Sequence, residues 1–595
     1  HMKEIISQRL ASLRAAMKKA DVDAVIIPQT DPHQSEYLAD HWQVRRWLTG
    51  FTGSAGSLVL TQADALLWTD SRYFLQAAQQ LEDTPVKLMK DGLPGTPSIT
   101  AYLSGTLVKE STVGIDGALF SINETAALRT ALEKHGLRLD TAFNPVDTIW
   151  TDRPELPDAK VFVHDVKYAG ESATSKISQI LNDAASQGAS AMFISALDEI
   201  AWTLNIRSRD VSCNPVATAF LYLDPKGSTL FIKEDKIDPR TRAYLAEASV
   251  GIAPYEHMLQ FLSSLPESAK VLIEAMRTSS QVLDTLAARA IVGASPIPLL
   301  KATKNNTQIA GIRTSMEQDG AALVASFMEM ERMMAQGEKL TELKVAEILT
   351  RFRSQQPGYF DESFETIAGY GPHGAIVHYS ASPESSSTVE PHGLLLIDSG
   401  AQYLTGTTDI TRTIAMGTPT AQEKHDFTLV MKGHIALATA IFPEGTRGAQ
   451  LDALARQFLW KEGLSYLHGT GHGVGHFLNV HEGPQSIRLN DMPATIVPGM
   501  LTSNEPGLYR AGIHGIRCEN LVLTVEAFSS EEFGRFFRFE TMTLFPFDRT
   551  LFDTTIMTQE EINWLNGYHA EVYSRLSPLL SAEQQEWLRA KTLPL

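Results

Sequence analysis

The sequence predicts an α/β protein of three domains, because its length requires several domains and its periodicity divides into three segments. The chain has 595 residues, whereas a single hydrophobic core stops growing near about 250–300 residues. Short apolar runs that suit buried strands alternate with stretches of helical periodicity, which is typical of the α/β class. The same order of segments begins again after residue 158, so we expect two related N-terminal domains before a third.

We place the first domain at residues 2–155. Four apolar residues at helical spacing predict an amphipathic helix at its start: Ile6, Leu10, Leu13 and Met17. Residues 23–28 form a short apolar run that predicts a buried strand, and we expect a helix to follow around Tyr37. The stretch WTDRPELPD at 150–158 is rich in proline and acidic residues, which indicates a linker.

The second domain is placed at residues 156–302. Its periodicity predicts a helix near 174–187, a strand at 189–195 and a second helix at 198–205. This strand and the helix after it follow one another in the order expected for the first domain, which indicates an internal duplication. The polar stretch KATKNN at 301–306 marks the boundary to the third domain.

The third domain is placed at residues 303–595. It begins with two helical patterns at 307–335 and 341–353, and it ends with another at 556–594. Between them, from about residue 360, the chain becomes strand-like and rich in glycine. The polar residues that suit catalysis gather in this middle part.

Charge and composition exclude several classes of protein. The formal net charge is −18, from 51 Lys and Arg against 69 Asp and Glu, whereas nucleic-acid binding needs clustered positive charge. No apolar run approaches the roughly 20 residues that span a bilayer, and no signal-peptide pattern opens the chain. Two cysteines suit a reducing compartment. We therefore expect a cytoplasmic protein that binds neither nucleic acid nor membranes.

Five polar residues of the third domain stand in contexts that suit metal ligands: Asp398, Asp409, His472, Glu505 and Glu519. Asp398 directly follows an apolar run, where a carboxylate is costly unless it is paired or bound to a cation. A turn rich in Gly, Ser and Thr leads from it to Asp409. A hairpin can therefore place the two carboxylates side by side, where they would repel each other without a cation between them.

The other three candidates lie in segments with signals of their own. His472 is at the centre of HGTGHGVGH, where alternate glycines remove side chains around the imidazole. Glu505 follows a strand-like segment and is fixed by the Pro-Gly pair after it. In the strand-like IRCEN segment, the period of two puts Arg517 and Glu519 on one face.

The charge balance of these candidates favours two metal ions. Four carboxylates contribute −4, which two divalent cations would balance. An oxygen-rich set with one imidazole and no thiolate suits manganese, cobalt or iron and tolerates zinc. Paired ions can lower the pKa of a shared water and polarise a carbonyl group. Each residue alone is more often a turn, cap or core residue, and the glycine-rich segment fits neither a phosphate loop nor a helical HExxH site.

The ordered set, with its flanking residues, resembles the metallopeptidase family that shares the pita-bread fold and includes methionine aminopeptidase, prolidase and aminopeptidase P. The resemblance is greatest to the cytosolic three-domain Xaa-Pro aminopeptidases of this family and runs over nearly the whole chain. It rests on five segments: 31–56, 68–80, 205–223, 369–379 and 468–484. It implies two creatinase-like N-terminal α/β domains followed by a pita-bread catalytic domain.

The resemblance also implies a role for each candidate ligand. Asp398 should bind one metal ion, and His472 and Glu505 should bind the other. Asp409 and Glu519 should bridge both ions. Glu505 would in addition act as the general base.

Further residues are assigned by the same resemblance. His378 and His481 are expected to line the substrate and to stabilise the tetrahedral intermediate. His468 should help to form the subsite for the proline ring. Arg517, beside a bridging ligand, and Arg72, in the first domain, complete the expected substrate-binding set.

The activity implied is removal of one N-terminal residue from peptides with proline in second position, by attack of metal-activated water on the scissile carbonyl. The expected cofactors are two divalent ions, most simply Mn²⁺, with Co²⁺ or Zn²⁺ as alternatives. A homodimer is expected from the resemblance alone. Two other readings of the chain stay open: a prolidase limited to dipeptides, and a catalytically inactive pita-bread protein that binds a partner.

Overall fold

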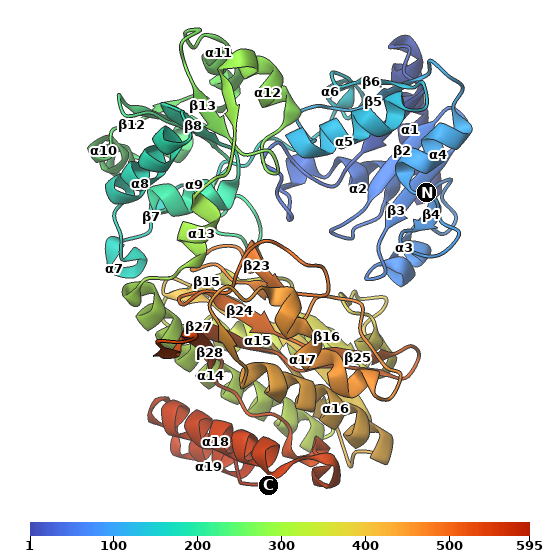
Figure 1. Ribbon diagram of the computed structural model, residues 1–595. Helices are drawn as coiled ribbons and strands as arrows, with labels where there is room; N and C mark the ends of the chain where they lie inside the picture. The colour runs from blue at the N-terminus through green and yellow to red at the C-terminus, as the bar shows by residue number, and fades with distance from the viewer. The chain divides into compact units, whose positions relative to one another are not determined.

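A computed structural model describes all 595 residues, which divide into two compact units (Figure 1). The first unit comprises His1–Val163, Glu171–Ser212 and Val216–Ile297. The second comprises His164–Gly170, Cys213–Pro215 and Pro298–Leu595. No helix is both long enough and apolar enough to cross a membrane.

The first unit opens with a helix and a six-stranded sheet. Helix α1 (Met2–Lys19) buries Ile6, Leu10, Leu13 and Met17, so the predicted amphipathic helix is confirmed. The sheet has the order β4-β3-β2-β1-β5-β6. Its strands are β1 (Ala24–Ile27), β2 (Ser57–Thr61), β3 (Ala65–Thr69), β4 (Lys87–Lys90), β5 (Thr112–Gly114) and β6 (Arg138–Asp140). All four residues of the central strand β1 are buried, which confirms the strand predicted at 23–28.

A second sheet in this unit repeats the first, with the order β12-β11-β10-β8-β13-β14. Its strands are β8 (Ala191–Ile194), β10 (Phe220–Leu223), β11 (Ser228–Phe231), β12 (Val250–Ala253), β13 (Val271–Ile273) and β14 (Ala290–Val292). The alternation of parallel and antiparallel pairs is the same in both sheets. Helices α8 (Ala173–Ser186) and α9 (Leu197–Leu204) flank β8, as predicted. The two sheets therefore share one topology, as the proposed duplication requires.

The helix predicted around Tyr37 is wrong. The chain from Asp31 to Tyr37 forms turns and bends, a short 3-10 helix follows at Asp40–Trp42, and the next α-helix, α2 (Val44–Thr49), begins later. The reason is local, because one carboxylate oxygen of Asp31 accepts hydrogen bonds from the backbone N–H groups of His33 and Ser35. Such side-chain bonds offer the backbone an alternative to a helix.

Long helices pack against the sheets of the second unit (Figure 1). They are α14 (Asn306–Ala335), α15 (Glu342–Arg353), α16 (Ala421–Ala438) and α17 (Gly448–Trp460). Helix α14 begins at a capping box, in which the side chains of Asn305 and Gln308 bond each other's backbone N–H. The helices predicted at 307–335 and 341–353 are therefore confirmed.

Two sheets of the second unit carry the candidate ligands. A three-stranded sheet has the order β16-β17-β20, with β16 (Ile367–Tyr370), β17 (Leu394–Ser399) and β20 (Ile410–Ala415). A six-stranded sheet has the order β21-β28-β27-β24-β22-β23. Its strands are β21 (Ile441–Pro443), β22 (Gly471–Gly473), β23 (Glu482–Ile487), β24 (Leu501–Asn504), β27 (Asn520–Ser530) and β28 (Gly534–Thr541). A two-stranded hairpin of β25 (Gly507–Arg510) and β26 (His514–Arg517) lies between β24 and β27 in the sequence.

The C-terminal segment completes the core of this unit. Helices α18 (Gln559–Leu576) and α19 (Ala582–Lys591) confirm the helical pattern predicted for residues 556–594, and both contact α14 (Figure 1). The buried guanidinium of Arg412, on β20, donates to the carbonyls of Phe545 and Pro546 and to the hydroxyl of Tyr568. It also donates to the backbone carbonyl of Glu519. One arginine thus connects a candidate ligand to the last part of the chain.

Candidate metal centre

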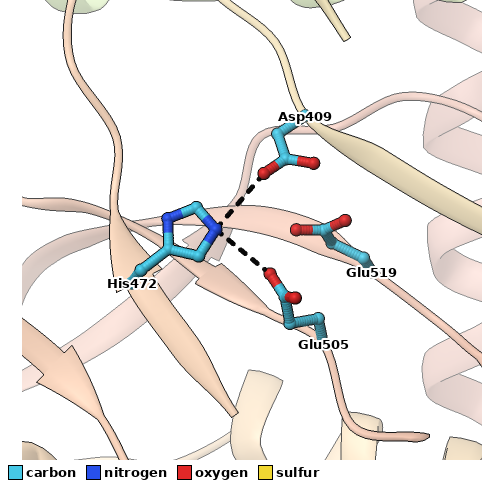
Figure 2. A group of neighbouring side chains, drawn as sticks. All are labelled: Asp409, His472, Glu505 and Glu519. Carbon is cyan, nitrogen blue, oxygen red and sulfur yellow. Dashed lines mark ion pairs between the residues drawn. The ribbon is translucent and has the colours of Figure 1, made fainter. Parts of the chain in front are cut away.

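Four of the five candidate ligands lie together in the second unit: Asp409, His472, Glu505 and Glu519 (Figure 2). One ligand atom of each lies within 4.8 Å of the corresponding atom of every other. His472 Nε2 is 3.3 Å from a carboxylate oxygen of Asp409 and 3.3 Å from one of Glu505. Four distant segments of sequence therefore form one cluster.

The ends of strands place these side chains. Asp409 directly precedes β20, and Glu505 directly follows β24. Glu519 lies between the hairpin and β27, where it forms an isolated bridge with Thr411 and accepts a 2.7 Å hydrogen bond from the Thr411 hydroxyl. His472 is the middle residue of β22.

The glycines beside His472 make room for neighbouring strands. A Cβ atom at Gly471 would lie 1.9 Å from the carbonyl oxygen of Ser503, and one at Gly473 would lie 2.6 Å from that of Glu482. Both distances are far below contact, so only glycine lets β22 approach the chain on both sides. These glycines were expected to let the backbone and the imidazole approach an ion, and they are also required by backbone packing.

Asp398, the fifth candidate, lies at the edge of the cluster on β17, opposite Thr411 in register. Arg517 donates to it through Nη2, at 2.8 Å, and through Nε, at 3.2 Å. Both of these bonds reach the same carboxylate oxygen, Oδ2. The other oxygen of Asp398 and one oxygen of Asp409 are buried without a hydrogen-bond partner. Buried carboxylate oxygens are costly in that state, so these residues fit a bound cation.

The pKa shifts describe a site that holds protons at neutral pH. Burial, with the charges of Asp409, Glu505 and Asp398, raises the pKa of Glu519 well above its usual range. Burial opposes ionisation of Glu505, but hydrogen bonds with Glu519 and His472 outweigh it and hold the pKa of Glu505 well below its usual range. Burial likewise opposes the charging of His472, yet its two carboxylate partners raise its pKa. Protons therefore neutralise part of the charge that metal ions would neutralise, and the oxygen-rich donor set suits divalent cations.

Metal binding should therefore depend on pH. Burial raises the pKa of Asp398 from 3.8 to about 7; Arg517 opposes the shift, and the charges of Asp409 and Glu505 add to it. Between these two values the folded metal-free protein holds a proton that the unfolded chain releases, so its free energy of unfolding falls as pH rises. A cation that binds ionised Asp398 removes this penalty.

We expect the rise in melting temperature on adding Mn²⁺ to chelator-treated protein to be larger at about pH 8 than at about pH 6. Differential scanning fluorimetry at both values measures it. The variant Asp398→Asn serves as control, because it has no carboxylate to titrate, and its smaller shift should change less with pH. Equal rises in the melting temperature of the unchanged protein at the two pH values would contradict the assignment of Asp398 as a metal ligand.

Two of the predicted histidines, His481 and His468, lie near the cluster, and the third follows a residue that contacts Arg517. The His481 ring stands edge-on to the ring of His472, with centroids 4.4 Å apart. His468 Nε2 lies 2.7 Å from the hydroxyl of Tyr509, and its Nδ1 lies 2.8 Å from the carbonyl of Gly469. His378 follows Val377, whose carbonyl accepts a 3.4 Å hydrogen bond from Arg517.

Tyr509 is a residue of this site that the sequence argument missed. Its hydroxyl accepts a 2.9 Å hydrogen bond from Arg517 Nη1 and donates to His468, so His468, Tyr509, Arg517 and Asp398 form one chain of bonds. Burial, with the charge of Arg517, lowers the pKa of His468 to about 4, so this imidazole is neutral. The sequence signal that pointed to Tyr509 was Gly507, which pairs with Arg517 across the hairpin. A Cβ atom at position 507 would lie 2.4 Å from the Tyr509 hydroxyl, so the glycine leaves space for this tyrosine.

Arg72 belongs to the first unit, unlike the other candidates. Its guanidinium forms two 2.8 Å hydrogen bonds with the two carboxylate oxygens of Asp70, in the turn after β3. Nearly a third of the Arg72 side chain is exposed. Its role toward a substrate stays a prediction.

Four segments of the chain match protein-family models, which carry three descriptions. "Metallopeptidase family M24" matches residues 310–526, and "C-terminal region of peptidase_M24" matches 535–595. "Creatinase/Prolidase N-terminal domain" matches twice, at 9–149 and 152–308. The predicted fold class, two creatinase-like domains before a pita-bread catalytic domain, is confirmed.

Individual proteins are similar to this chain over nearly its whole length. Aminopeptidase P2 of Arabidopsis thaliana is 41% identical and covers 100% of this chain and 89% of its own. A probable Xaa-Pro aminopeptidase P of Laccaria bicolor is 42% identical, and the match covers 99% of this chain and 94% of the relative. The crystal structure of X-prolyl aminopeptidase from Caenorhabditis elegans, described as a cytosolic enzyme with a di-nuclear active site, is 35% identical, covers 100% of both chains and superposes with a TM-score of 0.96. The chain therefore belongs to metallopeptidase family M24, among the aminopeptidase P proteins that carry two creatinase-type N-terminal domains.

Proposed function

We propose that this protein is a metal-dependent Xaa-Pro aminopeptidase, which releases the N-terminal residue from peptides with proline in second position. The observation that carries the proposal is the cluster of three carboxylates and one imidazole, with Asp398 beside it, in a chain that is similar to aminopeptidase P proteins over its full length. A chain that kept only the fold for partner binding would have no reason to hold this costly group of buried charges.

The five ligands divide between two divalent ions in this proposal. Asp398 would hold one ion, His472 and Glu505 would hold the other, and Asp409 and Glu519 would be shared by both. Mn²⁺ is the proposed metal, because four carboxylates and one imidazole form a hard donor set. Co²⁺ and Zn²⁺ are the alternatives that this set would also accept. Bound there, the ions polarise the scissile carbonyl and lower the pKa of a water.

The residues of the chain move the protons and hold the substrate. Glu505 accepts the proton of the attacking water as the general base. His481 and His378 donate hydrogen bonds to the oxyanion that develops on the scissile carbonyl. One of them then gives a proton to the proline nitrogen, which becomes the leaving amine.

The same residues can select for proline. A peptide bond to proline has no N–H, and its ring fixes φ near −65°, so an enzyme for this bond needs a pocket shaped for the ring. His468 is neutral and held in one orientation by Tyr509 and Gly469, which suits it to contact an apolar ring. Asp398 receives the free amino group in this proposal, and Arg517 holds that carboxylate by two hydrogen bonds.

Four further features belong to the proposal. Domain boundaries lie near residues 155 and 302, and the protein is cytoplasmic. Arg72 contacts the substrate or a neighbouring subunit, and the protein forms a homodimer. The C. elegans relative is described as cytosolic, which supports the proposed location.

Peptide cleavage tests the function directly. Chelator-treated protein is incubated with Xaa-Pro-Xaa and Xaa-Ala-Xaa tripeptides, an Xaa-Pro dipeptide and an N-acetylated Xaa-Pro-Xaa, with and without Mn²⁺, and the products are measured by mass spectrometry. We expect metal-dependent loss of one residue from the free Xaa-Pro tripeptide and none from the alanine or acetylated peptides. Cleavage of the dipeptide alone would indicate a prolidase. No cleavage with any metal would favour the inactive, partner-binding alternative.

A further inference from the structure

Glu342, outside the metal cluster, is the buried acceptor of an unusual number of hydrogen bonds. It is the first residue of α15, and its side chain is fully buried. Its carboxylate has four donor groups, of which two are side chains: Tyr379 Oη at 2.8 Å and His373 Nδ1 at 2.9 Å. The other two are the backbone N–H groups of Tyr370, at 2.7 Å, and Ser387, at 2.8 Å. A buried carboxylate is tolerable only when its oxygens are satisfied in this way.

These donors all belong to one segment, residues 370–387. Tyr370 ends β16 and Ser387 lies where the chain returns to α15, so Glu342 holds both ends of the segment. His373 and Tyr379 lie between the two ends, and their rings stack with centroids 4.3 Å apart. The segment is thus tied at four points to a single side chain.

The same segment also contacts residues beside the candidate metal centre. The carbonyl of Val377 accepts from Arg517, the partner of Asp398. Gly374 lies so close to Gly515 that a Cβ atom on Gly515 would be 1.7 Å from the Gly374 carbonyl oxygen. His378 stands between Val377, which contacts the site, and Tyr379, which contacts Glu342.

We propose that Glu342 is a positioning residue for His378, and that it fixes the segment carrying this histidine relative to the metal centre. The inference rests on the proposed function, in which His378 donates a hydrogen bond to the substrate. Catalytic groups must be held to within a fraction of an ångström, which residues behind them achieve by hydrogen bonding. All four donors point at Glu342, so an amide in its place would turn an N–H group toward at least one of them.

The variant Glu342→Gln tests the proposal against Glu347→Gln as matched control. Glu347 lies on the same helix, and its side chain is exposed and paired with Lys344. For Glu342→Gln we expect kcat on an Xaa-Pro tripeptide to fall about 10–100-fold with metal content unchanged; the control should keep normal turnover. In a protein that already carries His378→Ala, Glu342→Gln should cause no further loss of kcat, because the effects of residues that act as a unit do not add. A further loss in the double variant would overturn the proposal.

A second readout does not depend on catalysis. Hydrogen–deuterium exchange should rise in peptides covering 371–387 in Glu342→Gln, and it should not rise in Glu347→Gln. Tyr379→Phe removes one donor but keeps the aromatic ring, so it provides a milder variant should Glu342→Gln not fold, with a smaller change in the same direction. Unchanged exchange in both variants would refute the positioning role even if the unchanged protein cleaves no peptide, and absence of cleavage alone would count only against the proposed activity.

Discussion

Replacing Glu519 with alanine is expected to abolish hydrolysis of Xaa-Pro peptides and to remove both metal ions. The carboxylate lies within 4.8 Å of the other three clustered ligands, so in the proposed site both ions share it. Its loss leaves each ion short of a ligand and leaves fewer negative charges to attract two cations. Metal content after dialysis, measured by inductively coupled plasma mass spectrometry, should fall from about two equivalents toward zero.

The matched control for this change is Glu526→Ala. Glu526 lies on β27, the strand that follows Glu519, but its side chain is exposed and paired with Arg535. It should keep full metal content and turnover, because an exposed ion pair contributes little. Two equivalents of metal in Glu519→Ala would contradict the bridging role, whereas one equivalent would reassign Glu519 to a single ion.

His481→Ala should separate catalysis from metal binding. The His481 ring lies edge-on to that of His472, but His481 is not one of the clustered ligands. We therefore expect both metal ions to remain. Turnover should fall about 10²–10³-fold, the usual effect of removing one donor to a developing oxyanion. Steady-state kinetics on an Xaa-Pro tripeptide gives the loss in kcat, and metal analysis confirms occupancy.

His425→Ala provides the comparison for His481→Ala. His425 lies on α16, and its Nε2 pairs with Glu462 at 2.7 Å near the surface. Its removal should leave turnover unchanged. Near-normal turnover in His481→Ala would return that residue to a structural role, and loss of metal from the variant would show instead that its ring supports His472.

The sequence predicted the helices and the candidate ligands from local signals. The helix expected at 307–335 is found at Asn306–Ala335, because its apolar period and its capping residues agree. Carboxylates at the ends of buried strands could be recognised, since such positions need a partner for the charge. The helix expected around Tyr37 failed because side-chain bonds from Asp31 to the backbone outweigh a weak helical period.

Contacts between distant segments could not be predicted from the sequence. Tyr509 is an ordinary strand residue until the hairpin brings its hydroxyl to Arg517 and His468. Glu342 likewise has the position of a residue in the first helical turn, where acidic side chains are common. Its four donors come from a segment that begins 28 residues later in the sequence. For the contacts of Glu342 a single sequence contains no signal, and for those of Tyr509 it contains only Gly507.

The contacts of Arg412 have a consequence for the order of events during synthesis. This arginine donates both to the carbonyl of Glu519 and to the chain at Phe545, Pro546 and Tyr568. A nascent chain that has emerged only as far as Glu519 has all five candidate ligands but lacks these partners. Its buried guanidinium would then have several unsatisfied donors. The segment around Glu519 should therefore become fully ordered only after the chain has been made as far as Tyr568.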